Sequence, residues 1–243
     1  MQNPADKHHT PHTPGDEGSS RMWLYGGIAL LVIALIYSVG IFMRSRSNAG
    51  STSVSDMAPV NFDPANDQFG VAIGPADAKV VVREFADYQC PACGGFEPVL
   101  AQMRKDYVDT GKVRFVFFDF PLDIHKNALV AAQVARCAGE QNHYWEMHDY
   151  LYAHQAEWGD LADPADKFVS YAGATGVEGS KLMSCIRTGA TRQAVLRSQD
   201  FGNAYGLTAT PTFAVNGKAH AGGISYADLK TLIDQQLAAP AAH

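Results

Sequence analysis

The sequence predicts an α/β domain that contains a helical insertion and follows a single N-terminal transmembrane helix. Three observations support this fold class: strand-like apolar runs at both ends of the domain, a long helical stretch between them, and an uncharged apolar run near the N-terminus. This order of strands and helices is typical of a sheet covered by helices. With 243 residues and 47% hydrophobic content, the chain can form one medium-sized domain with a hydrophobic core.

The uncharged run extends from Met22 to Phe42 and has aromatic residues near both ends. A helix of this length, at ~1.5 Å per residue, spans roughly the ~30 Å of bilayer hydrocarbon. A cleaved signal peptide usually has only about 7–15 apolar residues, although Ser47-Asn48-Ala49 resembles a cleavage site. We therefore expect an uncleaved transmembrane helix over residues 22–43, with signal-peptide cleavage as the alternative.

Polar segments lie on both sides of the predicted membrane helix. Residues 1–21 are rich in Pro, His, Asp, Gly and Ser, a composition that predicts a disordered tail. Residues 44–70 have a similar composition and predict a polar tether between the membrane and the domain. We expect the folded domain to occupy residues 71–243.

The first elements of the domain follow from the spacing of its apolar residues. Lys79–Phe85 predicts a strand. Beyond it, apolar residues recur three and four apart as far as Tyr107, which predicts a helix that contains Pro98 and ends at Gly111. Val113–Phe118 is almost continuously apolar and predicts a strand that is buried on both faces.

Between these elements and the C-terminal ones, the sequence predicts a helical insertion at about residues 122–205. The strand pattern returns only at Thr212–Val215, and Asn216-Gly217 predicts a hairpin turn after it. An amphipathic helix is expected at Tyr226–Leu237. Within the insertion, helices are expected at 128–138, at 144–152, after Asp163-Pro164, at 182–186 and at 194–205.

The most informative motif is Cys90-Pro91-Ala92-Cys93, which stands between the first strand and its helix. At a helix start, unpaired N–H groups and the helix dipole stabilise a negative charge, which lowers the pKa of the first thiol. Cys90 is therefore predicted to be the nucleophile, and Cys93, one turn further on, the resolving thiol. A structural disulfide or half of a zinc site is the alternative.

Cys137 and Cys185 flank most of the helical insertion. We predict a structural disulfide between them, because closing a loop of about 48 residues contributes roughly 4 kcal/mol in the chain-entropy model. Two buried free thiols and an auxiliary redox pair remain alternatives.

Several motifs together resemble those of one known family. They are the stretch from Glu84 to Cys93, then Pro98, then Tyr144-Trp145-Glu146-Met147-His148-Asp149, and last Thr210-Pro211-Thr212-Phe213 ahead of Asn216-Gly217. In this order and spacing, residues 71–237 are similar to the DsbA-like thiol-disulfide oxidoreductases. The resemblance implies a thioredoxin-like fold with a helical insertion. It also implies a cis bond before Pro211, which would turn the Thr210 backbone toward a substrate peptide.

Further roles near the cysteines follow from the resemblance. Glu84 is expected beneath the cysteine pair, as a buried carboxyl group that moves protons to or from Cys93. The alternative is a partly exposed residue paired with Arg83 or a lysine. Pro91 and Ala92 are expected to tune the redox potential. Strong oxidants of this family often have His at the position of Ala92, so we expect a milder oxidant than an enzyme with a Cys-Pro-His-Cys motif.

These features predict an enzyme that introduces disulfide bonds into reduced exported proteins. The resemblance implies re-oxidation by a DsbB- or VKOR-like quinone-linked membrane oxidase. A disulfide isomerase or reductase of the cell envelope is one alternative, and a non-catalytic zinc-holding or chaperone-like module is another. The net charge of −6 argues against nucleic acid as a partner. We expect a monomer with no cofactor and no metal site, in which His125 and His148 serve packing or helix capping.

An oxidant belongs outside the reducing cytosol, so we place the catalytic domain on the periplasmic side of the cytoplasmic membrane. Positive charges flank the apolar run almost equally and slightly favour the opposite orientation, but a long domain can be translocated despite nearby positive charge. They are Lys7 and Arg21 before the run, and Arg44 and Arg46 after it.

Overall fold

The structure is a computed structural model that describes residues 58–240. The predicted tail, membrane helix and first part of the tether lie outside the described residues. Within the described range, no helix is both long enough and apolar enough to cross a bilayer.

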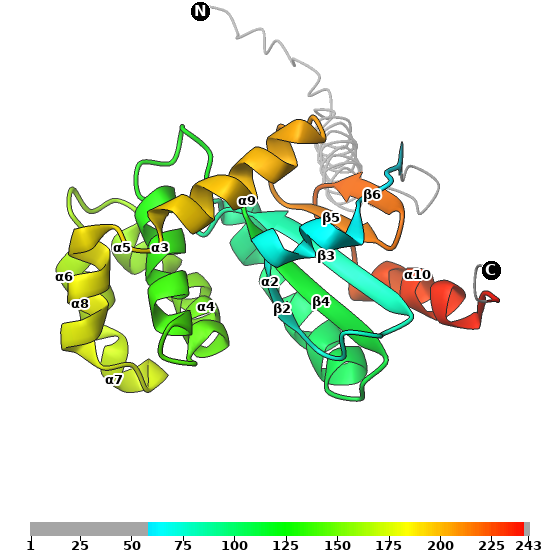
Figure 1. Cartoon of the computed structure of the whole chain (residues 1–243), viewed down its shortest axis with the longest axis horizontal. Coiled ribbons are helices and arrows are strands. Elements are labelled where there is room, and N and C mark those ends of the chain that lie inside the picture. Colours follow the sequence, from blue (N-terminus) through cyan, green and yellow to red (C-terminus); the bar gives the residue numbers. More distant parts are fainter. Residues whose placement is uncertain (1–57, 241–243) are drawn as a thin grey trace, which may run out of the picture. The chain divides into compact units, whose positions relative to one another are not determined.

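A six-stranded sheet forms the centre of the described domain (Figure 1). Its strand order is β1-β6-β5-β3-β4-β2, with β3 and β4 parallel and the other neighbours antiparallel. β3 therefore lies in the interior of the sheet, between β4 and β5. The strands are β1 (Ala58–Pro59), β2 (Val71–Ile73), β3 (Val80–Ala86), β4 (Val113–Asp119), β5 (Thr212–Val215) and β6 (Lys218–Ala221).

Helices connect these strands, and most of them belong to one segment between β4 and β5 (Figure 1). This confirms the α/β fold with an inserted helical region. Before the insertion come η2 (Pro64–Phe69), α2 (Pro91–Met103) and η3 (Arg104–Val108), and after it comes α10 (Tyr226–Ala238). The insertion contains α3 (Ala128–Gly139), α4 (Tyr144–Ala153), α5 (Gln155–Trp158), α6 (Ala165–Ser170), α7 (Ala172–Thr175), α8 (Gly179–Thr188) and α9 (Arg192–Ala204).

Side-chain alternation along β3 divides the core between the two faces of the sheet. Val80, Val82 and Ala86 join a cluster that includes apolar residues of α2 and α10. Phe85 points to the opposite face and packs against Phe118 of β4 and residues of α9. The strand is buried on both sides, as its nearly continuous apolar sequence predicts.

The segment before β2 is part of the folded domain, although its polar composition predicts a tether that extends to residue 70. β1 pairs with β6, and the Phe62 ring is buried and stacked on Phe85 at a centroid distance of 5.6 Å. The Arg83 guanidinium pairs with Asp67 at 2.6 Å. The composition of the segment gave no sign of this packing, because the segment is mostly polar and Phe62 is the residue that it buries in the core.

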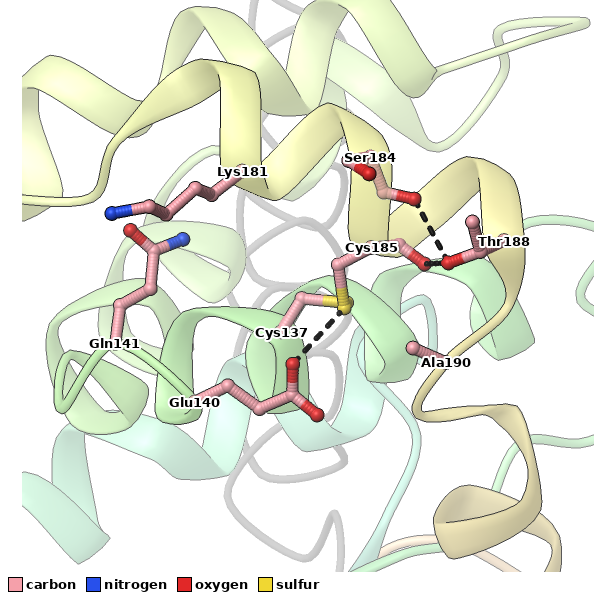
Figure 2. A pocket seen from close by; sticks show the side chains of 8 residues that line it. All are labelled: Cys137, Glu140, Gln141, Lys181, Ser184, Cys185, Thr188 and Ala190. Carbon is pink, nitrogen blue, oxygen red and sulfur yellow. Dashed lines mark hydrogen bonds between the residues drawn. A yellow bond between two sulfur atoms is a disulfide. The ribbon is translucent and has the colours of Figure 1, made fainter.

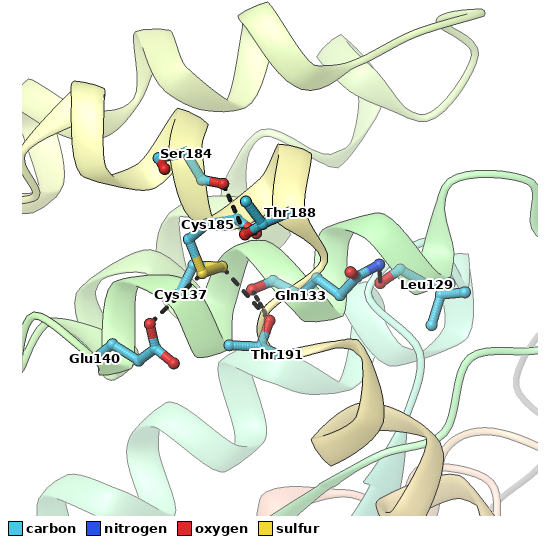
Figure 3. Close-up of a disulfide and its surroundings, with 8 residues drawn as sticks. All are labelled: Leu129, Gln133, Cys137, Glu140, Ser184, Cys185, Thr188 and Thr191. Carbon is cyan, nitrogen blue, oxygen red and sulfur yellow. Dashed lines mark hydrogen bonds between the residues drawn. A yellow bond between two sulfur atoms is a disulfide. The ribbon is translucent and has the colours of Figure 1, made fainter.

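Cys137 of α3 and Cys185 of α8 are joined by a disulfide with an S–S distance of 2.00 Å. The bond borders an open pocket of about 360 Å³ that is lined only by residues of the insertion (Figure 2). On the buried side, the Thr191 hydroxyl lies 3.4 Å from the Cys137 sulfur and donates to the Gln133 carbonyl (Figure 3). The disulfide thus links two helices of the insertion that are 48 residues apart in sequence at this point.

Removing this disulfide should destabilise the protein. We expect the double variant Cys137→Ser/Cys185→Ser to lose about 4 kcal/mol of unfolding free energy, because the unfolded chain regains the entropy of an open loop. Denaturant unfolding of the oxidised wild type and the variant measures this difference. Ser184→Ala, next to the bond, is the control and should unfold like the wild type. Equal stability of the double variant and the wild type would contradict the structural role.

Candidate functional site

The turn between β3 and α2 positions the first cysteine. Cys90 is the N-cap residue of α2, and Pro91 occupies the first turn, where its missing N–H costs no hydrogen bond. The Cys90 amide donates to the Asp87 carbonyl at 3.0 Å, and the Asp87 carboxylate accepts from the Gln89 amide at 2.7 Å. The sulfur of Cys90 is thereby placed at the amide-lined start of the helix.

The environment of Cys90 stabilises its thiolate. Hydrogen bonding from the Cys93 side chain is the largest cause of a pKa lowered to about 5 for Cys90. Partial burial opposes this effect, whereas the backbone amides of Ala92 and Cys93 add to it. Cys90 is therefore an anion at neutral pH, which is the nucleophilic form of a cysteine.

Cys93, in contrast to Cys90, keeps its proton at neutral pH. It is 1% exposed, and burial raises the pKa of its thiol far above the usual range. Hydrogen bonding to Cys90 and the charge of Glu84 raise this pKa further. Both cysteines are free thiols in this structure, so the pair consists of one thiolate and one neutral thiol that donates to it.

The loop before β5 lies against the cysteine pair. The Thr210–Pro211 peptide bond is cis, as the resemblance implies. The Thr210 carbonyl oxygen lies 3.5 Å from the Cys90 sulfur. Two segments that are 120 residues apart in sequence therefore meet at the Cys90 sulfur.

Glu84 lies on the face of β3 that is covered by α2. Its neighbours across the sheet are Phe117 and Phe213, and the residue is 1% exposed. Burial raises the pKa of Glu84 well above its usual value, the charge of Glu97 raises it further, and Arg104 opposes both. Pairing with Arg83 does not occur, because the Arg83 side chain binds Asp67.

Several polar residues around the cysteines escaped the sequence analysis. Gln155 of α5 donates to the carbonyl oxygens of Tyr88 and Cys90 at 2.7 and 2.9 Å, so the insertion holds the turn that leads to Cys90. Glu97 follows Cys93 by one helical turn, and this spacing could have identified Glu97 from the sequence. No local pattern marks Gln155, because its contacts depend on how the insertion folds back.

The two histidines considered in the sequence analysis have distinct surroundings. His125 Nδ1 lies 2.7 Å from the carboxylate of Asp87, a residue of the turn that precedes Cys90. His148 is fully buried, with its ring 4.7 Å from that of Phe117 and its Nδ1 2.9 Å from Asp149.

Glu97, His148 and Asp149 form the one group of potential metal ligands found among residues 58–240. Arg104 already pairs with both carboxylates, at 2.8 Å to Glu97 and 2.7 Å to Asp149. The guanidinium thus neutralises the charge that would attract a cation.

A second pocket, of about 260 Å³, lies beside the residues of α2 that follow the cysteine motif. It is bordered by α2 and η3 on one side and by α4 of the insertion on the other. Its lining residues are Gly94, Glu97, Pro98, Ala101, Arg104, Asp149, Tyr152 and Ala153.

Comparison with known proteins agrees with this geometry. The family model described as "Thioredoxin" matches residues 66–235. The crystal structure of oxidised BdbD from Bacillus subtilis has a TM-score of 0.66 at 24% identity, and the match covers 76% of this chain and 100% of BdbD. At this identity the likeness shows the fold.

Curated relatives match over most of the described domain. "Disulfide bond formation protein D" of Bacillus subtilis is 25% identical over 206 residues, which are 80% of this chain and 86% of the relative. "Na(+)/H(+) antiporter NhaA 3" of Salinispora tropica is 36% identical over 197 residues, or 79% of this chain. The chain spans only 28% of the length of that antiporter. The fold, with its inserted helical region, is also similar to that of alpha-DsbA1 from Wolbachia pipientis, which has a TM-score of 0.62 at 23% identity. The family model, which matches more than half of the chain, shows that this protein belongs to the thioredoxin family.

Proposed function

We propose that this protein is a thiol-disulfide oxidoreductase that forms disulfide bonds in exported proteins through Cys90 and Cys93. The observation that carries the proposal is the contrast between the two thiols. Cys90 has a pKa lowered to about 5, whereas its neighbour Cys93 is buried and neutral. A stabilised thiolate in the reduced pair makes the corresponding disulfide a better oxidant, because reduction yields a favourable product.

The proposed reaction transfers a disulfide from the protein to its substrate. A substrate thiolate attacks the Cys90 sulfur of the Cys90–Cys93 disulfide, and Cys93 leaves as a thiolate that takes up a proton. A second substrate thiolate then attacks the substrate sulfur of the mixed disulfide, and Cys90 leaves as a stabilised thiolate. The substrate has lost two electrons, which the reduced protein must pass to an external acceptor.

The same geometry suggests how a substrate peptide is held. The Thr210 carbonyl lies beside the Cys90 sulfur, and the loop before β5 continues into a sheet strand. A peptide extended along this loop would gain strand-like backbone hydrogen bonds while its cysteine meets Cys90. Such recognition does not depend on sequence, which suits an enzyme that acts on many proteins.

The alternative functions receive less support. A Cys₄ zinc site would need all four cysteines as thiolates, but Cys137 and Cys185 are bonded to each other. A reductase benefits from a stable disulfide, whereas the low pKa of Cys90 favours the reduced pair. Ala92 has no side-chain donor for the thiolate, so we propose an oxidant milder than one with His at this position.

We further propose that the domain acts outside the cytosol, held by an N-terminal membrane anchor at residues 22–43 and re-oxidised by a DsbB- or VKOR-like quinone-linked membrane oxidase. The disulfide in the insertion suits an oxidising compartment. Anchoring in the same membrane would raise the effective concentration of the oxidase.

The ionisation of Cys90 provides one test. We expect alkylation of the reduced protein and its thiolate absorbance to show a midpoint at a pH of about 5. Cys93→Ala should raise this midpoint, because it removes the main hydrogen-bond donor, whereas Cys93→Ser should change it less. Because the pKa is lower in the folded state, the stability of the reduced form should fall as the pH falls toward 5. A midpoint like that of free cysteine would contradict the proposed chemistry.

The direction of the reaction provides a second test. Equilibration with reduced and oxidised glutathione should give a potential between about −270 mV, typical of thioredoxin, and about −120 mV, typical of DsbA. Ala92→His, which adds a donor near Cys90, is the matched variant and should shift the potential toward the more oxidising value. Oxidation of a reduced peptide should accordingly be faster than reduction of insulin. A potential near that of thioredoxin would instead favour the reductase.

The identity of trapped substrates provides a test of location. In cells, Cys93→Ser should accumulate mixed disulfides between Cys90 and its substrates, because the resolving thiol is missing while a hydroxyl donor remains. We expect the captured proteins, identified by mass spectrometry after non-reducing purification, to be exported ones. The double variant Cys90→Ala/Cys93→Ser is the control and should capture none. Capture of cytosolic proteins would rule out the proposed sidedness.

A further inference from the structure

We propose that Gln155 of the helical insertion is a positioning residue for the redox pair, and that Gly94 of α2 leaves the space that the Gln155 amide occupies. Through this side chain the insertion contributes to the redox potential of Cys90 and Cys93. The inference rests on the proposed function, because a redox potential has a role only if the two cysteines form and break a disulfide.

The side-chain amide of Gln155 binds the backbone on both sides of Gln89. Its Nε2 atom donates to the Tyr88 carbonyl oxygen at 2.7 Å and to the Cys90 carbonyl oxygen at 2.9 Å. A primary amide has two N–H groups, so Gln155 can hold both oxygen atoms at once. The Cys90 carbonyl also accepts the Gly94 amide at 3.1 Å, which is the first hydrogen bond of α2. The Gln155 amide thus lies where the turn becomes the helix.

Two effects connect these bonds with the ionisation of Cys90. A carbonyl oxygen carries partial negative charge, and the Cys90 carbonyl belongs to the same residue as the thiolate. The N–H groups of Gln155 offset that charge, which favours the anion. The same bonds fix the turn, so that the Cys90 sulfur stays beside the backbone amides of Ala92 and Cys93. Both effects stabilise the reduced pair, so loss of Gln155 should make the disulfide a weaker oxidant.

Gly94 explains how the Gln155 amide can approach α2 so closely. A Cβ atom at Gly94 would lie 3.2 Å from Gln155 Oε1 and 3.5 Å from its Cδ and Nε2 atoms, so the amide would have to move. Glycine is less stable than alanine inside a helix, and the space for the amide is a physical reason for glycine here. A Cβ atom at Gly95, by contrast, would have nothing within 4 Å.

The helix that carries Gln155 is itself fixed at its far end. The buried side-chain amide of Asn127 donates to three carbonyl oxygens around the end of α5, at distances of 2.9, 3.0 and 3.1 Å. These oxygens belong to Leu161, Gly159 and Trp158. The Trp158 side chain is fully buried and holds the same end in the core. Gln155 therefore extends from a rigid segment, which a residue that positions a reacting group requires.

Equilibration with glutathione measures the proposed effect. Glutathione disulfide takes two electrons from the reduced pair, the Cys93 proton and one proton from the buffer, and becomes two thiols while an S–S bond joins Cys90 and Cys93. We expect Gln155→Leu to change this equilibrium about tenfold in favour of the protein disulfide, or about 30 mV toward a more reducing potential. The pH midpoint of Cys90 alkylation should rise in the same variant. Gln155→Glu keeps the shape but exchanges the N–H donors for a carboxylate, and it should shift both readouts at least as far.

Gly94→Ala tests the same contact from the side of α2. The added methyl group should displace the Gln155 amide and shift both readouts in the same direction as Gln155→Leu. In the double variant Gly94→Ala/Gln155→Leu the two shifts should not add, because both substitutions remove one interaction. Gly95→Ala adds a methyl group where nothing lies nearby, and Gln102→Leu removes an exposed amide of α2 that donates to Asp106. Both are matched controls and should keep the wild-type values.

The outcomes separate the positioning role from its alternatives. A wild-type potential and a wild-type alkylation midpoint in both Gln155→Leu and Gly94→Ala would overturn the inference. Additive shifts in the double variant would overturn it as well, because Gly94 would then act independently of Gln155. Alanine is favoured in helices, so Gly94→Ala should fold and decides the matter if Gln155→Leu does not. Failure of the wild type to exchange with glutathione would refute the proposed function, and the alkylation midpoint would still test the role of Gln155.

Discussion

The hydrogen bond that the Cys93 thiol donates to the Cys90 sulfur gives the two cysteines opposite properties. Cys90 lies at the amide-lined start of α2 and is an anion, whereas Cys93 lies one turn inside the core and keeps its proton. The bond requires a sharp boundary between a polar helix end and an apolar interior. This boundary lies between the two sulfur atoms. It is formed by β3, α2 and the loop before β5.

The helical insertion does more than cover the sheet. Gln155 binds the carbonyl oxygens of Tyr88 and Cys90, and α4 brings Tyr152 and Asp149 next to residues that follow Cys93 on α2 and η3. Arg104 pairs with carboxylates from both parts and so joins the insertion to the thioredoxin-like core. The disulfide between α3 and α8 fixes the far side of the insertion. These contacts make the position of the insertion part of the redox site.

Strong local patterns explain why much of the fold could be predicted. β3, β4 and β5 have nearly continuous apolar sequences, and Asn216-Gly217 marks the hairpin that connects β5 to β6. The N-terminal edge of the domain was missed, because its contacts are to distant residues: β1 pairs with β6, Phe62 packs on Phe85, and Asp67 pairs with Arg83. Such a segment resembles a linker until its partners are known.

The sequence alone identified Cys90 as the thiol that ionises, since a cysteine before a proline at a helix start has local reasons to do so. It also predicted a second cysteine one turn further on, a buried carboxyl residue on β3 and the order of strands and helices, all of which depend on residue spacing. Only the tertiary structure decided that Cys93 is sealed from water, that the Thr210 carbonyl lies beside Cys90, and that Glu97, Arg104 and Tyr152 line one pocket. Burial and long-range charge contacts depend on how distant segments pack, and no local pattern encodes that packing.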